Sequence, residues 1–284
     1  MELKQYSWWG GDNPPPENLK TKKQLSEFGL SPKNPVGVII TSKYKLQLYD
    51  PENPDSVRQK RKVSPKQLEV LKKGQRKAQY QKWYRDGGFM ELDRVEAIKW
   101  AESMIAEGNF CILDTETTSL DGEVVEIAII DSQGNPEINT LIKPREEISP
   151  EAQAVHGITA EMVATAPRLD DIWEEVYRVI SSHKNLIIYN SGFDLRRIKQ
   201  SLKVKTGLRK LKAHCLITWY AQFYGEWSTK YDDYKFQPLN GGHRALGDCL
   251  AALDILKEMA QADKEFWCPV PEYLPKMEDE NGEI

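Results

Sequence analysis

Two carboxylates two positions apart close a short apolar run in the middle of the chain. Asp114 and Glu116 follow the run Phe110–Leu113, whose length and composition predict a buried strand. Side chains alternate between the two faces of a strand, so both acids share one face. Acids held together in this way repel each other and lose hydration. A divalent cation would relieve both effects, whereas two solvated acids at an exposed strand end are the simpler alternative.

Two later stretches bring further polar groups to similar places. Asn185–Asn190 is a second apolar strand candidate, and Asp194 follows it at a strand-to-helix junction. His243 and Asp248 lie five positions apart around the start of a predicted helix, so we expect them near each other. Carboxylate oxygens are ligands for Mg²⁺ or Mn²⁺. The residue types therefore indicate a site for divalent metal ions.

The three blocks Asp-x-Glu, Asn-x-x-Phe-Asp and His-x4-Asp occur in this order along the chain. Their order and spacing resemble the DnaQ-like 3′–5′ exonucleases of the DEDDh type, which have the RNase H-like fold. The resemblance covers about residues 91–262. It implies that Asp114 bridges two Mg²⁺ ions, with Mn²⁺ as the alternative, while Glu116 and Asp248 complete one ion and Asp194 serves the other.

The resemblance also implies roles for the remaining polar and apolar groups of these blocks. His243 would be the general base, for which the ordinary histidine pKa of about 6.5 is suitable; a helix-capping histidine is the alternative. His156 is expected to be a structural or substrate-side residue, because His243 already fills the catalytic position. The residues implied in holding the terminal nucleotide are Thr117, Thr118, Leu120, Asn190 and Phe193. Ser119 stands where many relatives have glycine, and Tyr189 where they often have histidine.

The elements that must position these groups are those of an α/β protein with an RNase H-like mixed sheet flanked by helices. Phe110–Asp114 is expected as the central strand of a three-stranded meander. The other expected elements are a helix starting at a capping box at Asp93, strands at 123–131, 137–142 and 210–215, helices at 169–183, 195–202, 216–224 and 243–262, and a substrate-side loop at 225–242.

The nuclease domain, expected at residues 90–262, follows a small α+β module at residues 1–89 and precedes an acidic, Pro-containing, peripheral tail at 263–284. The module is predicted to contain a hairpin at 35–49 and a basic helix that begins at a Ser64 capping box, turns Leu68 and Leu71 inward and ends at Gly87–Gly88. Between residues 56 and 85, eleven side chains are Lys or Arg, and Glu69 is the only acid. Such a helix is equally compatible with a nucleic-acid surface and with a solvated face.

Composition limits the class of protein further. The chain has 284 residues, 40% of them hydrophobic, and a formal net charge of -4, so a sizeable core is available. Its apolar runs are too short to cross a bilayer, and the polar N-terminus has no signal-peptide pattern. The four cysteines form no Cys-x-x-Cys pair. We therefore expect a cytoplasmic protein with reduced cysteines and no membrane partner.

The leading interpretation is a metal-dependent 3′–5′ exonuclease that releases nucleoside 5′-monophosphates from single-stranded 3′ ends, with DNA favoured over RNA. Polarity and product follow from the resemblance. One alternative is an exoribonuclease of the same fold. Another is a nucleic-acid-binding or polymerase-associated module with little activity of its own, which the presence of all five catalytic residues disfavours. A homodimer or association with a larger nucleic-acid-processing complex is compatible with the family.

Overall fold

The computed structural model describes residues 3–41, 44–203 and 212–275. The chain divides into two compact units, Met1–Arg76 and Lys77–Ile284. The division falls within helix α2 (Pro65–Trp83), upstream of the boundary expected after residue 89, and residues 263–275 belong to the second unit. Each unit has its own sheet and is described by itself below.

The first unit is a small α+β module, as expected. Its four-stranded sheet has the order β1 (Lys4–Tyr6), β4 (Gly37–Ile40), β5 (Lys45–Tyr49), β2 (Lys20–Thr21), with α1 (Lys22–Glu27) after β2 and a separate pair formed by β3 (Leu30–Pro32) and β6 (Val57–Gln59). Strands β4 and β5 are antiparallel, which confirms the predicted hairpin. Part of its predicted turn, residues 42–43, lies outside the described residues.

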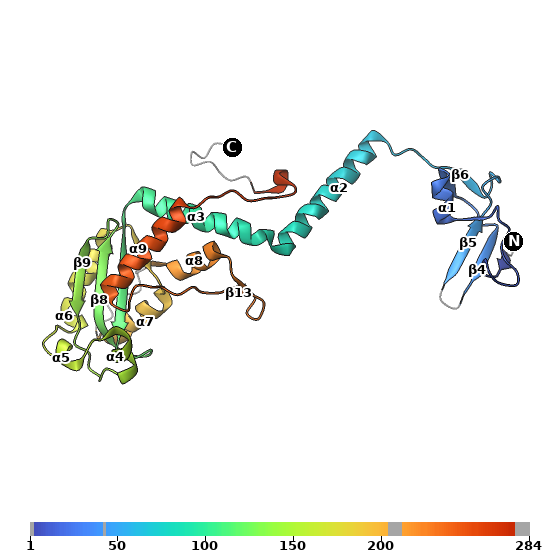
Figure 1. Cartoon of the computed structure of the whole chain (residues 1–284). Coiled ribbons are helices and arrows are strands. Elements are labelled where there is room, and N and C mark those ends of the chain that lie inside the picture. The colour runs from blue at the N-terminus through green and yellow to red at the C-terminus, as the bar shows by residue number, and fades with distance from the viewer. Residues whose placement is uncertain (1–2, 42–43, 204–211, 276–284) are drawn as a thin grey trace. The chain divides into compact units, whose positions relative to one another are not determined.

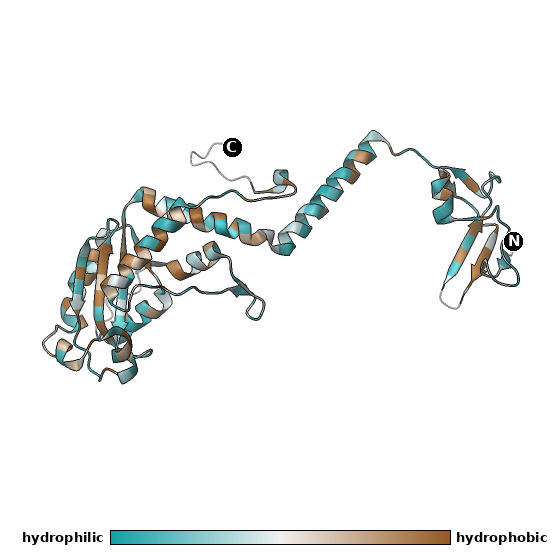
Figure 2. Cartoon of the chain, in the orientation of Figure 1, coloured by the Kyte–Doolittle hydropathy of each residue, from teal (hydrophilic) through white to brown (hydrophobic). Residues whose placement is uncertain are grey.

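Helix α2 begins as predicted but buries nothing. Gln67 N–H donates to Ser64 Oγ at 3.2 Å and Ser64 N–H donates to Gln67 Oε1 at 3.0 Å, which confirms the capping box. The expectation that Leu68 and Leu71 point inward is wrong, because both are about half exposed and no residue of α2 is buried. Charged and amide side chains surround the helix and leave no apolar stripe wide enough for packing, as the hydropathy colours show (Figure 2).

The predicted helix break at Gly87–Gly88 is confirmed. The π-helical turn η1 (Tyr84–Gly88) follows α2, and the chain kinks at Gly87, whose non-helical φ of 120° suits glycine, before α3 (Phe89–Glu107) begins. Asp93 therefore lies inside α3 and starts no helix. Its carboxylate instead accepts a hydrogen bond from the Tyr234 hydroxyl at 2.7 Å.

The second unit contains a five-stranded mixed sheet in the order β11 (Ala213–Cys215), β10 (Asn185–Ile188), β7 (Phe110–Thr117), β8 (Val124–Asp131), β9 (Pro136–Leu141). The neighbours β7, β8 and β9 are antiparallel, and β10 is parallel to both β7 and β11. This confirms the RNase H-like sheet and its meander with the first strand central. Strand β7 runs three residues past the expected end at Asp114, so the two acids lie within the strand.

Helices cover both faces of this sheet (Figure 1). Helices α3, α8 (Leu216–Tyr224) and α9 (Ala245–Gln261) pack on one face, and α6 (Leu169–Ser182) and α7 (Ser191–Ser201) on the other. Phe110 and Ile112 join the first cluster while Cys111 and Leu113 join the second, which is the alternation expected of a central strand. Short helices α4 (Pro150–His156) and α5 (Ala160–Val163) follow β9.

The loop at 225–242 and the tail contain small elements of their own. Strands β12 (Trp227–Ser228) and β13 (Asp233–Tyr234) pair within the loop, and the 3₁₀ turn η3 (Pro271–Tyr273) lies in the tail. The described part of the tail is not peripheral, because Cys268 and Val270 are buried and Lys264 Nζ lies 2.7 Å from a Glu102 oxygen. Among the described residues, no helix is both long and apolar enough to cross a membrane.

Candidate active site

Three carboxylates converge between the sheet and the helix that covers it. Asp114 and Glu116 lie on the face of β7 that also carries Ile112, facing α9, and Asp248 lies in the first turn of α9. One carboxylate oxygen from each residue lies within 4.8 Å of the other two. The period of two along β7 and the entry of α9 at this point of the sheet together produce the cluster.

The electrostatics of the cluster favour a bound cation. Burial, followed by the charges of Asp194, Asp248 and Glu116, raises the pKa of Asp114 well above its usual range. Burial and the neighbouring carboxylates also raise the pKa of Glu116 to about 8. The Oδ1 atom of Asp248 is buried and has no hydrogen-bond partner among the described residues. A positive ion would satisfy this oxygen and remove the repulsion, so the residues fit a divalent metal.

Asp194 lies beside this group, on the first turn of α7. Its Oδ1 accepts hydrogen bonds from Thr115 N–H at 3.1 Å and from Thr115 Oγ1 at 2.7 Å. Burial raises the pKa of Asp194 to about 7, although the bonds from Thr115 act in the opposite direction. The structure thus brings the fourth predicted acid close enough to affect Asp114, but not into the group of three.

His243 is exposed on the loop that leads into α9. Gly242 and His243 have φ values of 91° and 57°, so two successive left-handed residues turn the chain just before the helix. A Cβ atom on Gly241 would lie 2.0 Å from Asp248 Oδ1, so only glycine allows this close approach. Burial raises the pKa of Asp248, and the nearby charge of His243 lowers it, which is consistent with their expected proximity.

An ion pair between a buried carboxylate and a half-exposed guanidinium follows His243 and was not predicted from the sequence. Glu126 of β8 lies opposite Glu116 and is 3% exposed. Its oxygens accept hydrogen bonds from Arg244 Nε at 3.0 Å, from Arg244 Nη2 at 2.5 Å and from Ala245 N–H at 2.9 Å. Glu126 therefore caps α9 and fixes the residue that follows His243. A charged residue within the apolar run Val124–Ala128 was the available signal for it.

The residues expected to hold a nucleotide differ in their exposure. Leu120 is 85% exposed and Asn190 is exposed, so both are accessible, while Phe193 is half-buried under the Arg197 guanidinium. Thr117 and Thr118 are buried. Their hydroxyls already bond within the protein, Thr117 Oγ1 to the Ser119 carbonyl at 2.8 Å and Thr118 Oγ1 to Glu146.

Of the two roles expected for His156, structural or substrate-side, its contacts favour the structural one. It is 6% exposed, its Nε2 lies 3.1 Å from the Thr117 carbonyl oxygen, and its Nδ1 accepts from Ile158 N–H at 2.9 Å. Burial lowers its pKa, and the bond to Thr117 opposes that shift. Because both ring nitrogens are engaged, His156 can influence a nucleotide only by holding the backbone of Thr117.

Carboxylates that converge at the central strand of a mixed sheet can hold the metal ions that phosphodiester hydrolysis uses. In agreement, residues 111–256 match the protein family RNase_T, described as Exonuclease. The chain belongs to this exonuclease family and is a phosphodiester hydrolase.

Individual relatives are similar over different spans. An uncharacterized exonuclease, CP81 of Escherichia phage 186, is 35% identical over 190 residues, which cover 58% of this chain and 92% of the relative. Exodeoxyribonuclease 10 of Escherichia coli strain K12 is 38% identical over 88 residues, 30% of this chain and 38% of the relative. The PolC-type DNA polymerase III of Thermotoga maritima is 32% identical over 113 residues, 38% of this chain and 8% of the relative. A solved structure, exonuclease X in complex with 5′ overhanging duplex DNA, is 29% identical, with a TM-score of 0.38 and coverage of 55% of this chain and 95% of that chain.

Proposed function

We propose that this protein is a metal-dependent exonuclease that removes nucleoside 5′-monophosphates from single-stranded 3′ ends, with DNA as the favoured substrate. The convergence of Asp114, Glu116 and Asp248 beside the turn that contains Gly241 and His243 is the observation that carries the proposal. Clustered carboxylates with raised pKa values lower the stability of the protein unless a cation binds between them. A role in metal binding therefore explains their presence better than a role in packing.

The acids would hold divalent cations, Mg²⁺ first and Mn²⁺ as the alternative. Asp114, Glu116 and Asp248 provide one group of oxygen ligands, and Asp194 would serve a second ion. When bound, two such ions stabilise negative charge on the attacking and leaving oxygens of the phosphodiester. Thr115 keeps the carboxylate of Asp194 oriented through its two hydrogen bonds.

His243 would act as the general base. The water oxygen forms a bond to phosphorus while its proton passes to an imidazole nitrogen of His243. The bond between phosphorus and the 3′-oxygen breaks, and this oxygen takes a proton from solvent to become the new 3′-hydroxyl. The released product is a nucleoside 5′-monophosphate. Arg244 and Glu126 would hold the backbone beside His243 in place during this step.

The names of two relatives support DNA as substrate, since one is an exodeoxyribonuclease and another a DNA polymerase. Leu120 follows β7 and Asn190 precedes α7, and both are exposed, so they would contact the terminal nucleotide. Thr117 and Thr118 would contribute backbone groups, because their hydroxyls are engaged within the protein. Light scattering of the purified protein distinguishes a monomer from the homodimer that is compatible with the family.

The test uses purified protein, a single-stranded DNA labelled at its 5′ end, and an RNA of the same sequence. With Mg²⁺ we expect a ladder of shortening DNA and free 5′-mononucleotides, with a slower ladder for RNA and none in EDTA. Asp114→Asn is the matched control for a contaminating nuclease. Immediate release of the label as a mononucleotide would reverse the proposed polarity, and faster digestion of RNA would identify an exoribonuclease.

A further inference from the structure

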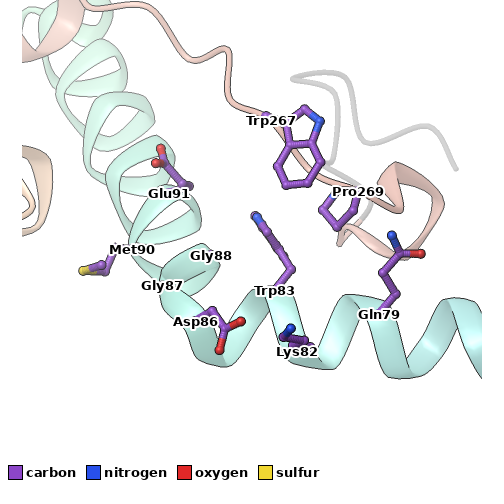
Figure 3. A pocket seen from close by; sticks show the side chains of 10 residues that line it. All are labelled: Gln79, Lys82, Trp83, Asp86, Gly87, Gly88, Met90, Glu91, Trp267 and Pro269. Atoms are coloured by element: carbon purple, nitrogen blue, oxygen red, sulfur yellow. The ribbon is translucent and has the colours of Figure 1, made fainter.

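A pocket that contains none of the clustered acids lies where η1 joins α2 to α3. Figure 3 shows that Trp83 points from the helix toward Trp267 and Pro269 of the tail, and Lys82 and Glu91 also line the pocket. The pocket has a volume of about 590 Å³, and all its lining residues belong to the second unit. Nothing in the proposed hydrolysis uses this pocket.

The floor of the pocket is a fixed aromatic surface. The Trp83 indole stacks on Phe266, with ring centroids 6.1 Å apart and planes 11° from parallel. It also lies on the backbone of Gly88, where an added Cβ would come within 2.4 Å of the indole ring. Two contacts therefore hold Trp83 in one orientation.

Trp267 provides a second, accessible ring. It is 73% exposed, although indole is among the side chains that gain most from burial. A folded protein that leaves such a ring in water next to a concave aromatic site has an apolar, planar surface available for a flat ligand. Nucleobases stack on rings of this kind without regard to sequence.

The charged residues that line the pocket suit different parts of a nucleic acid. Lys82 is exposed and can neutralise a phosphate. Asp86 and Glu91 also line the pocket. These carboxylates disfavour a phosphate deep inside it, but they can accept hydrogen bonds from the amino groups of a base. The base therefore fits inside the pocket, with the backbone outside it beside Lys82.

We propose that Trp83, Trp267 and Lys82 form an accessory site that stacks bases of single-stranded nucleic acid at a distance from the end being hydrolysed. This inference rests on the proposed function, because it assigns the site to the same substrate. A cationic side chain of a protein partner is the competing ligand, since two carboxylates and two indoles also suit an ammonium or guanidinium group. Lys82 in the pocket lining favours nucleic acid, as does the part of α2 that belongs to the second unit, where Lys77 and Lys82 are accompanied by no acid.

The experiment measures binding and hydrolysis separately. Binding of a fluorescent 40-nucleotide deoxycytidine strand, whose bases carry amino groups, is followed by anisotropy in EDTA, which prevents cleavage, and hydrolysis of a six-nucleotide strand is followed in Mg²⁺. We expect Trp267→Ala to weaken binding of the long strand at least about five-fold, the lower end of what one stacked base contributes, and to leave hydrolysis of the short strand unchanged. Trp267→Phe should restore most of the affinity, and Lys82→Gln should reduce the slope of log affinity against log salt by about 0.7.

Phe28→Ala is the matched control, because Phe28 is 63% exposed and belongs to the first unit. Wild-type affinity of Trp267→Ala for the long strand, or an equal loss in Phe28→Ala, overturns the accessory site. If Trp267→Ala loses binding to an octa-arginine peptide that the wild type binds, but keeps its affinity for DNA, the accessory site is also overturned and the pocket is assigned to a cationic partner. Failure of the wild type to hydrolyse the short strand refutes the proposed function instead, and the binding measurement does not depend on it.

Discussion

Removing Arg244 from its ion pair with Glu126 should destabilise the protein much more than removing the charge of Glu126. The Glu126 side chain is 4% exposed and that of Arg244 is 48% exposed. Arg244→Met would leave a buried carboxylate next to Glu116 with one remaining bond, from Ala245 N–H. An unpaired buried charge costs about 3–5 kcal/mol. Glu126→Gln would leave a half-exposed guanidinium that water can solvate, so we expect a loss of about 1–2 kcal/mol.

The double variant gives the sharper test. A neutral amide at position 126 needs no counter-charge, so Glu126→Gln combined with Arg244→Met should be more stable than Arg244→Met alone. The measurement is urea unfolding of the metal-free protein in EDTA, followed by circular dichroism. Lys235→Met is the matched control, because its partner Glu226 is about half exposed and a surface pair contributes at most about 1 kcal/mol.

Two results would refute this reasoning. If Arg244→Met is no more destabilising than Glu126→Gln, the buried carboxylate is not the costly partner. If the effects of the two single variants simply add in the double variant, the contacts seen between the side chains carry no coupling energy. We also expect both single variants to lower kcat more than they change KM, because the pair positions the backbone next to His243 and Asp248.

Three further predictions concern the cluster. Asp114→Asn should abolish hydrolysis yet raise the melting temperature in EDTA, because it removes one repelling charge; measurable turnover would contradict its role as a metal ligand. His243→Gln should lower kcat by about 10²- to 10⁴-fold with little change in substrate affinity, and an unchanged rate at pH 7 would require another base. In EDTA, stability should fall as pH rises from about 4.5 to about 8, since Glu116 keeps its proton in the folded state over this range and loses it when unfolded. Added Mg²⁺ should restore stability most at the upper end, and a flat urea midpoint across this range would contradict the raised pKa.

The sequence alone was enough to predict the strands and helices whose apolar residues recur with a regular period. The apolar runs of β7, β8 and β10 predicted the core of the sheet, and the spacing of two between Asp114 and Glu116 placed both acids on one face. Helices α6 and α8 have the predicted bounds to within one residue. These features are encoded locally, because the period of a strand or helix is fixed by its own backbone geometry.

Only the tertiary structure decided how groups distant in sequence meet. Glu126 and Arg244 are 118 positions apart, and no local pattern connects them. The engagement of both nitrogens of His156 and of the Asp194 carboxylate likewise depends on neighbouring elements. The fold also determines that the tail packs on α3, where Lys264 meets Glu102. An apolar or charged pattern identifies residues suited to burial or ion pairing, whereas the fold determines which of these residues meet.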